Sequence, residues 1–292
     1  MQISANRIAI EVDIQGPADG RPLLLIMGLG MQLVAWPEEL VQLLVARGFR
    51  VIRIDNRDAG LSQGFDHLGM PNLAWAAMRH LLHLPVHSPY GVADMAADAR
   101  GVLDALGIAR ADVCGASMGG MIAQHLASMA GGRVRSLTLM MTSSGARGLP
   151  QATLRVRRAL LTRPGRDPAR ILAHLERLFT LIGSPGYPPD LPTLRQRLQA
   201  SVARAWRPAG TARQLLAVMA DGDRSTLLGT IGVPTRVIHG DSDPLLPLAH
   251  GQDLLAKIPG AVADIVPGMG HDLPPQLLAH FAAGIADNAA RA

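Results

Sequence analysis

Cysteine, lysine and aromatic residues are scarce in this sequence of 292 residues. The single cysteine, Cys114, cannot form a disulfide within the chain, so the folded state must rely on its apolar core. Aromatic residues make up 3% of the chain, whereas hydrophobic residues as a class reach 48%. Leu, Val, Ile, Ala and Met therefore have to fill the core, and the composition supplies enough of them for a sizeable one.

Long hydrophobic runs are also missing, because no apolar stretch approaches the length of a membrane span. The N-terminal residues lack the basic segment followed by an apolar segment that marks a signal peptide. We therefore expect a soluble, cytoplasmic protein with no membrane partner. The net charge is +5, but the basic residues are almost all arginine and are not interleaved with aromatic residues, so we expect no nucleic-acid partner either.

Apolar strand patterns alternate with helical patterns along most of the chain. Strands are predicted at 7–14, 23–27, 51–54, 111–116, 133–141, 235–240 and 261–267. Helices are predicted at 37–48, 91–107, 118–129, 249–257 and 275–287. This alternation predicts an α/β protein with a mostly parallel sheet flanked by helices.

Residues 145–225 interrupt that alternation with helical, arginine-rich sequence. We predict a core formed by 1–144 and 226–292, with a helical cap inserted at 145–225. Thirteen of the 27 arginines fall within 155–224. They could form a cationic entrance for an anionic substrate, but solvated faces of the cap helices are the favoured interpretation.

The segment GASMG at 115–119 places Ser117 between glycines, where a predicted strand turns into a predicted helix. This pattern is typical of a nucleophile elbow, in which a strained backbone projects the serine hydroxyl from the sheet. Gly115 and Gly119 would be required because a Cβ at either position would collide in so tight a turn. The alternative is an ordinary glycine-rich turn.

A serine hydroxyl becomes nucleophilic when a histidine base, itself oriented by an acid, removes its proton. After a nucleophile elbow, the three residues occur along the chain in the order serine, acid, histidine. His271 fits as the base because it lies in a loop after the last predicted strand. The other histidines after Ser117 fall in predicted helices, in the insertion or in a strand: His125, His174, His239, His250 and His280.

The segment HGDSDP at 239–244 follows a strand and offers two carboxylates for the acid. Asp243 is our choice, and Asp241 is the alternative. A turn aspartate that bonds its own backbone is the non-catalytic interpretation, and it suits Asp241 better.

The oxyanion of an acyl-transfer intermediate needs N–H donors. One donor is expected from Met118, the residue after the nucleophile. The other is expected from the glycine-rich loop at 28–30, where we choose Leu29. The alternative for this loop is a glycine turn without a catalytic role.

Five motifs together resemble the α/β-hydrolase superfamily: MGLG at 27–30, RIDNRDAGLS at 53–62, GASMG at 115–119, HGDSDP at 239–244 and PGMGHDLP at 267–274. Within it, the chain is similar to the aclacinomycin methylesterase-like serine esterases, which share the Trp-Pro pair seen here at 36–37 and the Arg-Asp-x-Gly segment at 57–60. The resemblance implies an eight-stranded sheet, a helical cap between strands six and seven, and esterase chemistry. It places nucleophile, acid and base on Ser117, Asp243 and His271.

The predicted activity is hydrolysis of carboxylic esters of small to medium apolar molecules, including methyl esters, through an acyl-enzyme. A small-molecule ester is the expected partner, with no cofactor and no metal, and the oligomeric state stays open. A cofactor-free perhydrolase of the haloperoxidase type, a carbon–carbon bond hydrolase or a peptidase for short peptides would use the same triad. A non-catalytic ligand receptor on a hydrolase scaffold is the alternative from another class.

Overall fold

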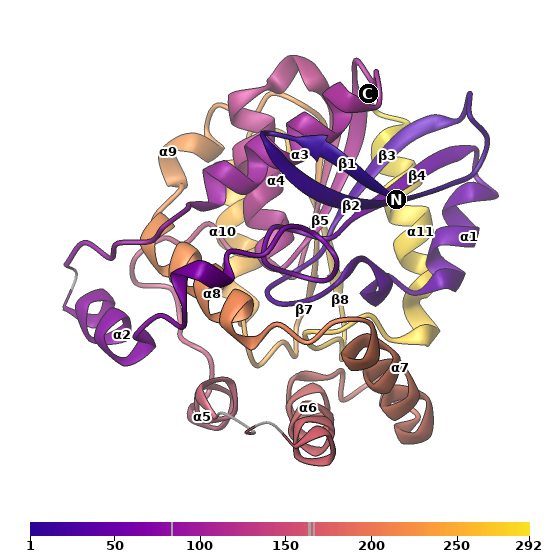
Figure 1. Cartoon of the computed structure of the whole chain (residues 1–292). Helices are drawn as coiled ribbons and strands as arrows, with labels where there is room; N and C mark the ends of the chain where they lie inside the picture. The colour runs from indigo at the N-terminus through magenta and orange to yellow at the C-terminus, as the bar shows by residue number, and fades with distance from the viewer. Residues whose placement is uncertain (83, 163–164, 166) are drawn as a thin grey trace.

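An eight-stranded sheet forms the centre of the computed structural model, which describes residues 1–82, 84–162, 165 and 167–292 (Figure 1). The strands lie in the order β1-β2-β4-β3-β5-β6-β7-β8. Strand β2 runs antiparallel to β1 and β4, and all other neighbours are parallel. The expected mostly parallel, eight-stranded sheet is therefore confirmed. The strands are β1 (Gln2–Ala5), β2 (Ile8–Gln15), β3 (Arg21–Ile26), β4 (Phe49–Ile54), β5 (Ala111–Ala116), β6 (Val134–Met140), β7 (Thr235–Gly240) and β8 (Val262–Val266).

Helices cover both faces of this sheet. They are α1 (Glu38–Val45), α3 (Val92–Ala105), α4 (Met118–Met129), α10 (Ala249–Lys257) and α11 (Leu278–Ala289). Helices α1 and α11 pack together on one face, on the right of Figure 1, and α3 and α4 pack together on the other. The two faces carry separate apolar clusters. Helices α1 and α11 contribute side chains to one cluster, and α3, α4 and α10 contribute to the other.

Residues 23–26 of the central strand β3 form a continuous apolar run because helices bury both faces of the sheet there. All six residues of β5 are buried. Burial raises the pKa of the Cys114 thiol, which keeps it protonated and unreactive in the core.

A helical insertion separates β6 from β7. Its helices are α5 (Leu154–Leu161), α6 (Pro168–Ile182), α7 (Leu191–Arg204), α8 (Pro208–Asp221) and α9 (Ser225–Leu228). Helix α6 lies between α5 and α7 along the lower edge of Figure 1, and α8 packs against α2 (Leu73–Leu81). The division into a core at 1–144 and 226–292 and a cap at 145–225 stays a prediction.

The sequence pattern did not predict β1 or α2. Strand β1 forms a hairpin with β2 through Asn6 and Arg7, whose φ angles are 48° and 66°. Such positive φ angles usually call for Asn-Gly, so the Asn-Arg pair gives a weak hairpin signal. No described helix has the length and apolarity that crossing a membrane requires.

Candidate active site

Ser117 occupies the sharp junction between β5 and α4, with φ 55° and ψ −121°. A Cβ on Gly115 would lie 2.2 Å from the Gly119 carbonyl oxygen, and a Cβ on Gly119 would lie 2.0 Å from the Ile26 carbonyl oxygen. Both glycines are therefore required by close backbone approach, as the sequence pattern predicts. The strained serine is the backbone outlier expected of a functional site.

Two further hydrogen bonds fix the elbow. The Ser117 N–H donates to the Met140 carbonyl at 2.9 Å, and the Thr142 hydroxyl donates to the Ser117 carbonyl at 2.7 Å. Met118 is the first residue of α4, so its N–H has no carbonyl within the helix to bond. The positive end of the helix dipole therefore lies beside the Ser117 side chain.

His271 lies between Ser117 and Asp243, which are 126 residues apart in the chain. Its Nε2 is 3.0 Å from Ser117 Oγ, and its Nδ1 is 2.7 Å from Asp243 Oδ2. The His271 N–H donates to the Ile182 carbonyl at the end of α6 at 2.7 Å, so the insertion helps to hold the loop that carries the histidine. The structure thus brings together the three residues that the sequence nominates.

The Asp243 carboxylate is buried and fully engaged. Its Oδ1 accepts the Leu245 and Leu246 N–H groups, each at 2.8 Å. Burial opposes ionisation, but the charge and hydrogen bond of His271 and these backbone bonds outweigh it, so the pKa of Asp243 lies below its usual value. An ionised Asp243 accepts the Nδ1–H of His271, which leaves Nε2 free to accept the Ser117 hydroxyl proton.

Asp241, the alternative acid, has a different position. It is exposed, and its Oδ1 accepts the Gly268 N–H at 2.7 Å. It therefore ties the loop after β7 to the loop after β8, and the same oxygen accepts the Ser242 hydroxyl at 2.8 Å. The bonds to backbone N–H groups of its own turn, expected for Asp241, are made instead by Asp243. Of the two carboxylates, Asp243 is the one that contacts His271.

The remaining histidines after Ser117 make other contacts. His125 Nε2 bonds Asp221 at 2.8 Å, and the Nε2–H of His250 donates to the Pro150 carbonyl at 2.9 Å. His239 Nε2 donates to the Leu246 carbonyl at 2.8 Å, and burial lowers the pKa of its imidazole. Within the described part of the chain, His271 alone among the histidines bonds Ser117.

The loop after β3 lies against the elbow. A Cβ on Gly28 would be 3.0 Å from the Ser117 Cβ, so the loop backbone contacts the serine directly. Asn56 Nδ2 donates to the Met27 carbonyl at 2.8 Å, and the Met31 N–H closes a turn onto the Gly28 carbonyl at 3.1 Å. Leu29 is half-buried inside this turn. Its N–H and that of Met118 stay the predicted oxyanion donors.

The arginines of the insertion differ in exposure, and Arg204 and Arg207 are half-buried. Exposed side chains, as the sequence predicts, belong to Arg155, Arg157, Arg158, Arg170, Arg177, Arg195 and Arg197. Arg163 and Arg166 lie outside the described residues. For Arg213 and Arg224 the prediction of solvated faces is wrong, because they are only 1% and 4% exposed.

Arg213 makes a two-pronged ion pair with Asp58, in which Nε and Nη2 each lie 2.7 Å from a carboxylate oxygen. The Tyr90 hydroxyl donates to the same carboxylate at 2.7 Å. Burial opposes ionisation of Asp58, but these hydrogen bonds outweigh it, so the pKa of Asp58 is lowered. Helix α8 is therefore joined to the core through a buried salt bridge, which is the physical reason that this arginine leaves the solvent.

A cavity of about 540 Å³ lies beside the elbow helix. Leu84, Val86, Met121 and Val218 contribute apolar side chains to its lining, and Ser143 contributes a hydroxyl group. Met121 lines the cavity and also belongs to the apolar cluster shared by α3 and α4. Trp36 is fully buried in the cluster shared by α1 and α11.

The motif at 53–62 carries part of the family resemblance, but the sequence assigned no role to its polar residues, which support the site. Asp55, Asn56, Arg57 and Asp58 directly follow β4 and are all buried. Four consecutive polar residues after an apolar strand are an unusual pattern for an exposed loop, and this could have signalled their role.

Comparison with known proteins defines the class. A profile of the alpha/beta hydrolase fold family matches residues 21–273, and the chain belongs to this family. It is 30% identical over 277 residues to the rhodomycin D methylesterase DnrP of Streptomyces peucetius, covering 88% of this chain and 87% of that one. It is 31% identical over 280 residues to the rhodomycin D methylesterase DauP of Streptomyces sp. (strain C5), covering 89% and 88%.

The fold is also similar to that of the enol-lactonase from Burkholderia xenovorans LB400. The TM-score is 0.75 with 22% sequence identity, over 99% of both chains. The family membership confirms the predicted α/β-hydrolase fold and identifies the protein as a hydrolase.

Proposed function

We propose that the protein is a serine esterase that cleaves carboxylic esters through an acyl-enzyme on Ser117. The observation that carries this proposal is the chain of hydrogen bonds from Ser117 Oγ through the His271 ring to the ionised Asp243 carboxylate. A serine hydroxyl becomes a nucleophile when a neighbouring base removes its proton.

The reaction follows from this arrangement. His271 Nε2 takes the proton of Ser117 as Oγ attacks the ester carbonyl, and Asp243 stabilises the imidazolium that forms. The N–H groups of Leu29 and Met118 hold the oxyanion of the tetrahedral intermediate. The carbon–oxygen bond to the alcohol then breaks, and His271 returns the proton to the leaving alcohol. Water, deprotonated by the same imidazole, hydrolyses the acyl-enzyme and releases the acid.

The proposed substrates are small to medium apolar esters, including methyl esters. The methylesterase names of the two Streptomyces relatives support the methyl ester.

A fluorophosphonate probe read by intact mass tests the mechanism, with turnover of p-nitrophenyl acetate, butyrate and octanoate measured in parallel. We expect one label on the wild-type protein, none on Ser117→Ala, and ester turnover that falls at least ~10⁴-fold in that variant. Turnover by pure Ser117→Ala near the wild-type rate would refute the assignment. A folded wild-type protein that neither labels nor turns over esters would favour a ligand receptor.

Substrate comparisons separate the enzymatic alternatives, because all of them use the same three residues. Faster peroxide-dependent halogenation than ester hydrolysis in metal-free buffer would favour a perhydrolase. A carbon–carbon bond hydrolase would cleave a vinylogous diketone faster than any of the esters, and a peptidase would cleave short peptides faster.

A further inference from the structure

The loop from Gly28 to Leu33, whose first residues are expected to hold the oxyanion, makes hydrogen bonds to the helical insertion at Gly30 and Gln32. Gln214 of α8 is 0% exposed and lies between two loops of the core. Its Oε1 accepts the Gly30 N–H at 2.7 Å, and its Nε2 donates to the Arg57 carbonyl at 2.7 Å. The two partners fix the orientation of the amide, because Gly30 can only donate and the Arg57 carbonyl can only accept.

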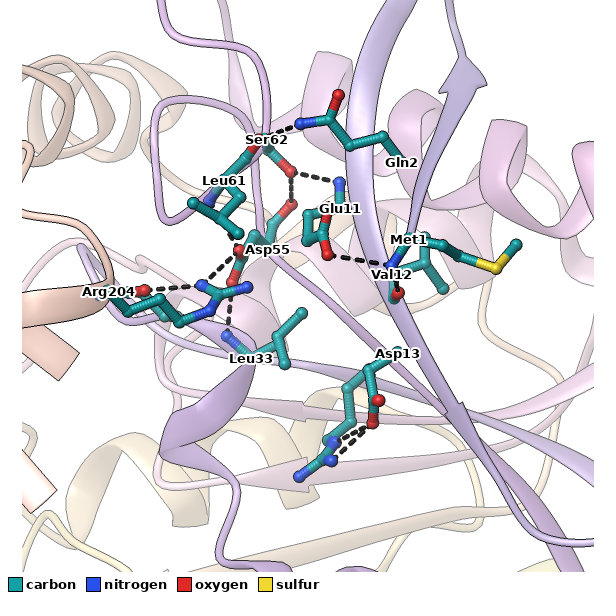
Figure 2. A network of polar contacts seen from close by, with 12 residues as sticks. Met1, Gln2, Glu11, Val12, Asp13, Leu33, Asp55, Leu61, Ser62 and Arg204 are labelled. Atoms are coloured by element: carbon teal, nitrogen blue, oxygen red, sulfur yellow. Dashed lines mark hydrogen bonds and ion pairs between the residues drawn. The ribbon is translucent and has the colours of Figure 1, made fainter. Parts of the chain in front are cut away.

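Other insertion residues reinforce this contact. A Cβ on Gly30 would lie 2.6 Å from Thr211 Oγ1, one turn before Gln214 on α8, so the helix packs directly onto the loop. Figure 2 shows Arg204 of α7 and the Leu33 N–H both directed at Asp55, at 2.7 Å and 2.6 Å. The loop from Gly28 to Leu33 is thus confined between Ser117 on one side and the insertion on the other.

These contacts determine the direction of the Leu29 N–H. The Gly28 carbonyl accepts the Met31 N–H, and in a trans peptide the Leu29 N–H points opposite to that carbonyl. The next peptide is fixed in turn by the bond from the Gly30 N–H to Gln214. These two hydrogen bonds restrain the peptide on each side of Leu29, and so restrain the orientation of its N–H.

We infer that Gln214 is a positioning residue of the active site, which holds the Leu29 N–H in the orientation that binds the oxyanion. This inference rests on the proposed esterase function. Gln214 acts through the loop and touches no reacting atom. An oxyanion donor contributes about 10²–10³-fold to kcat, and a misplaced one loses much of that contribution.

The test compares Gln214→Met with Gln124→Met. Gln124 is an equally buried glutamine whose amide accepts from Arg224 Nε at 2.9 Å and donates to the Ser143 carbonyl at 3.1 Å, away from the loop. We expect Gln214→Met to lower kcat about 10- to 100-fold with KM changed less than about threefold. Gln124→Met should keep kcat within about threefold while losing comparable thermal stability.

Affinity for a trifluoromethyl ketone, which forms a tetrahedral adduct with the serine, gives a second measurement. It should fall in proportion to kcat/KM in Gln214→Met and stay near wild type in Gln124→Met. Gln214→Glu keeps an oxygen facing the Gly30 N–H, so it should recover kcat toward wild type although a buried carboxyl lowers stability further. A purely structural role predicts the reverse order, with Gln214→Glu the less active variant.

If Gln214→Met does not fold, Gln214→Asn carries the same expectation, because its amide is one methylene too short to reach both loops. Equal kcat and ketone affinity in the Gln214 and Gln124 variants would overturn the inference while leaving the esterase proposal intact. A wild-type protein that binds neither the ketone nor fluorophosphonate would overturn both.

Discussion

The nucleophile elbow and the oxyanion loop lie against each other, but different parts of the chain determine their shapes. The elbow at 115–119 depends on its own glycines, because added Cβ atoms would lie 2.2 Å from the Gly119 carbonyl oxygen and 2.0 Å from the Ile26 carbonyl oxygen. The loop at 28–30 is confined by Gln214 and Thr211, which are more than 180 residues away in the chain. The elbow therefore depends on its own glycines and on the neighbouring strand β3, whereas the loop depends on how the insertion docks.

This difference separates two ways of damaging the enzyme. A change in the elbow alters the geometry of the nucleophile whatever the insertion does. A change in the contacts of α7 and α8 leaves the elbow intact and loosens only the oxyanion side. Substitutions can therefore test the comparison one region at a time.

The largest effect is expected from Asp243→Asn, which leaves both regions in place and removes the charge behind His271. Asparagine would favour the wrong imidazole tautomer, so kcat should fall about 10⁴-fold in steady-state ester kinetics. Asp241→Asn is the matched control and should stay within about threefold, because Asp241 is exposed and bonds the Gly268 N–H. Equal losses in the two variants would contradict our choice of acid.

Arg213→Met tests the docking of the insertion. It leaves the buried Asp58 carboxylate without its ion-pair partner, which should lower the free energy of unfolding by about 3–5 kcal/mol in denaturant titrations. Arg195→Met is the control, because this arginine is exposed and only pairs with Glu176 at 3.4 Å, so its loss should be below about 1 kcal/mol. Similar losses in both variants would mean that burial does not distinguish the two arginines.

Gly119→Ala tests the local encoding of the elbow. The nearest atoms to the new Cβ are backbone atoms of β3, so α4 must shift, and we expect a loss of about 1–3 kcal/mol. The shift would move the Ser117 hydroxyl and should lower kcat/KM about 10²-fold. Gly132→Ala has nothing within 4 Å of its new Cβ and should change neither value. An unchanged Gly119→Ala enzyme would show that the elbow tolerates a wider turn.

The smallest effect is expected from acid, which should weaken the ion pair between Asp58 and Arg213 by protonating Asp58. The pKa of Asp58 is lower in the folded protein than in the unfolded chain, so the unfolded chain binds the proton more readily. The stabilisation by Asp58 is therefore complete above about pH 4 and is lost as the pH falls through the lowered pKa. Denaturant titrations between about pH 6 and pH 3 should show a shallower decline for Asp58→Asn than for wild type. If the free energy of unfolding declined equally with pH in both proteins, Asp58 would make no contribution to the acid sensitivity.

Much of the fold could be predicted because its signals are local. The apolar runs at 23–27 and 111–116 mark strands buried on both faces, and the glycines of the elbow mark a turn that excludes Cβ atoms. Strand β1 escaped prediction because its turn uses Asn6 and Arg7 at positive φ, where Asn-Gly is the recognisable pair.

The candidate site could be predicted only in part. Chain order and loop position sufficed to nominate Ser117 and His271, and the sequence favoured Asp243 with Asp241 as the alternative. The structure separates the two carboxylates, because Asp243 is buried against His271 and Asp241 faces solvent. The sequence ranks two aspartates in one turn, but only the fold shows which of them contacts the histidine.

The sequence by itself determined the order of strands and helices, the strained serine and its glycines, because these follow from periodicity and from atoms close along the chain. Only the tertiary structure decided which arginines are buried and which side chains confine the oxyanion loop. Arg213 and Arg195 are both arginines on amphipathic helices, yet one pairs with a buried Asp58 and the other faces water. Their roles differ because burial and ion pairing depend on what a distant segment places opposite each side chain.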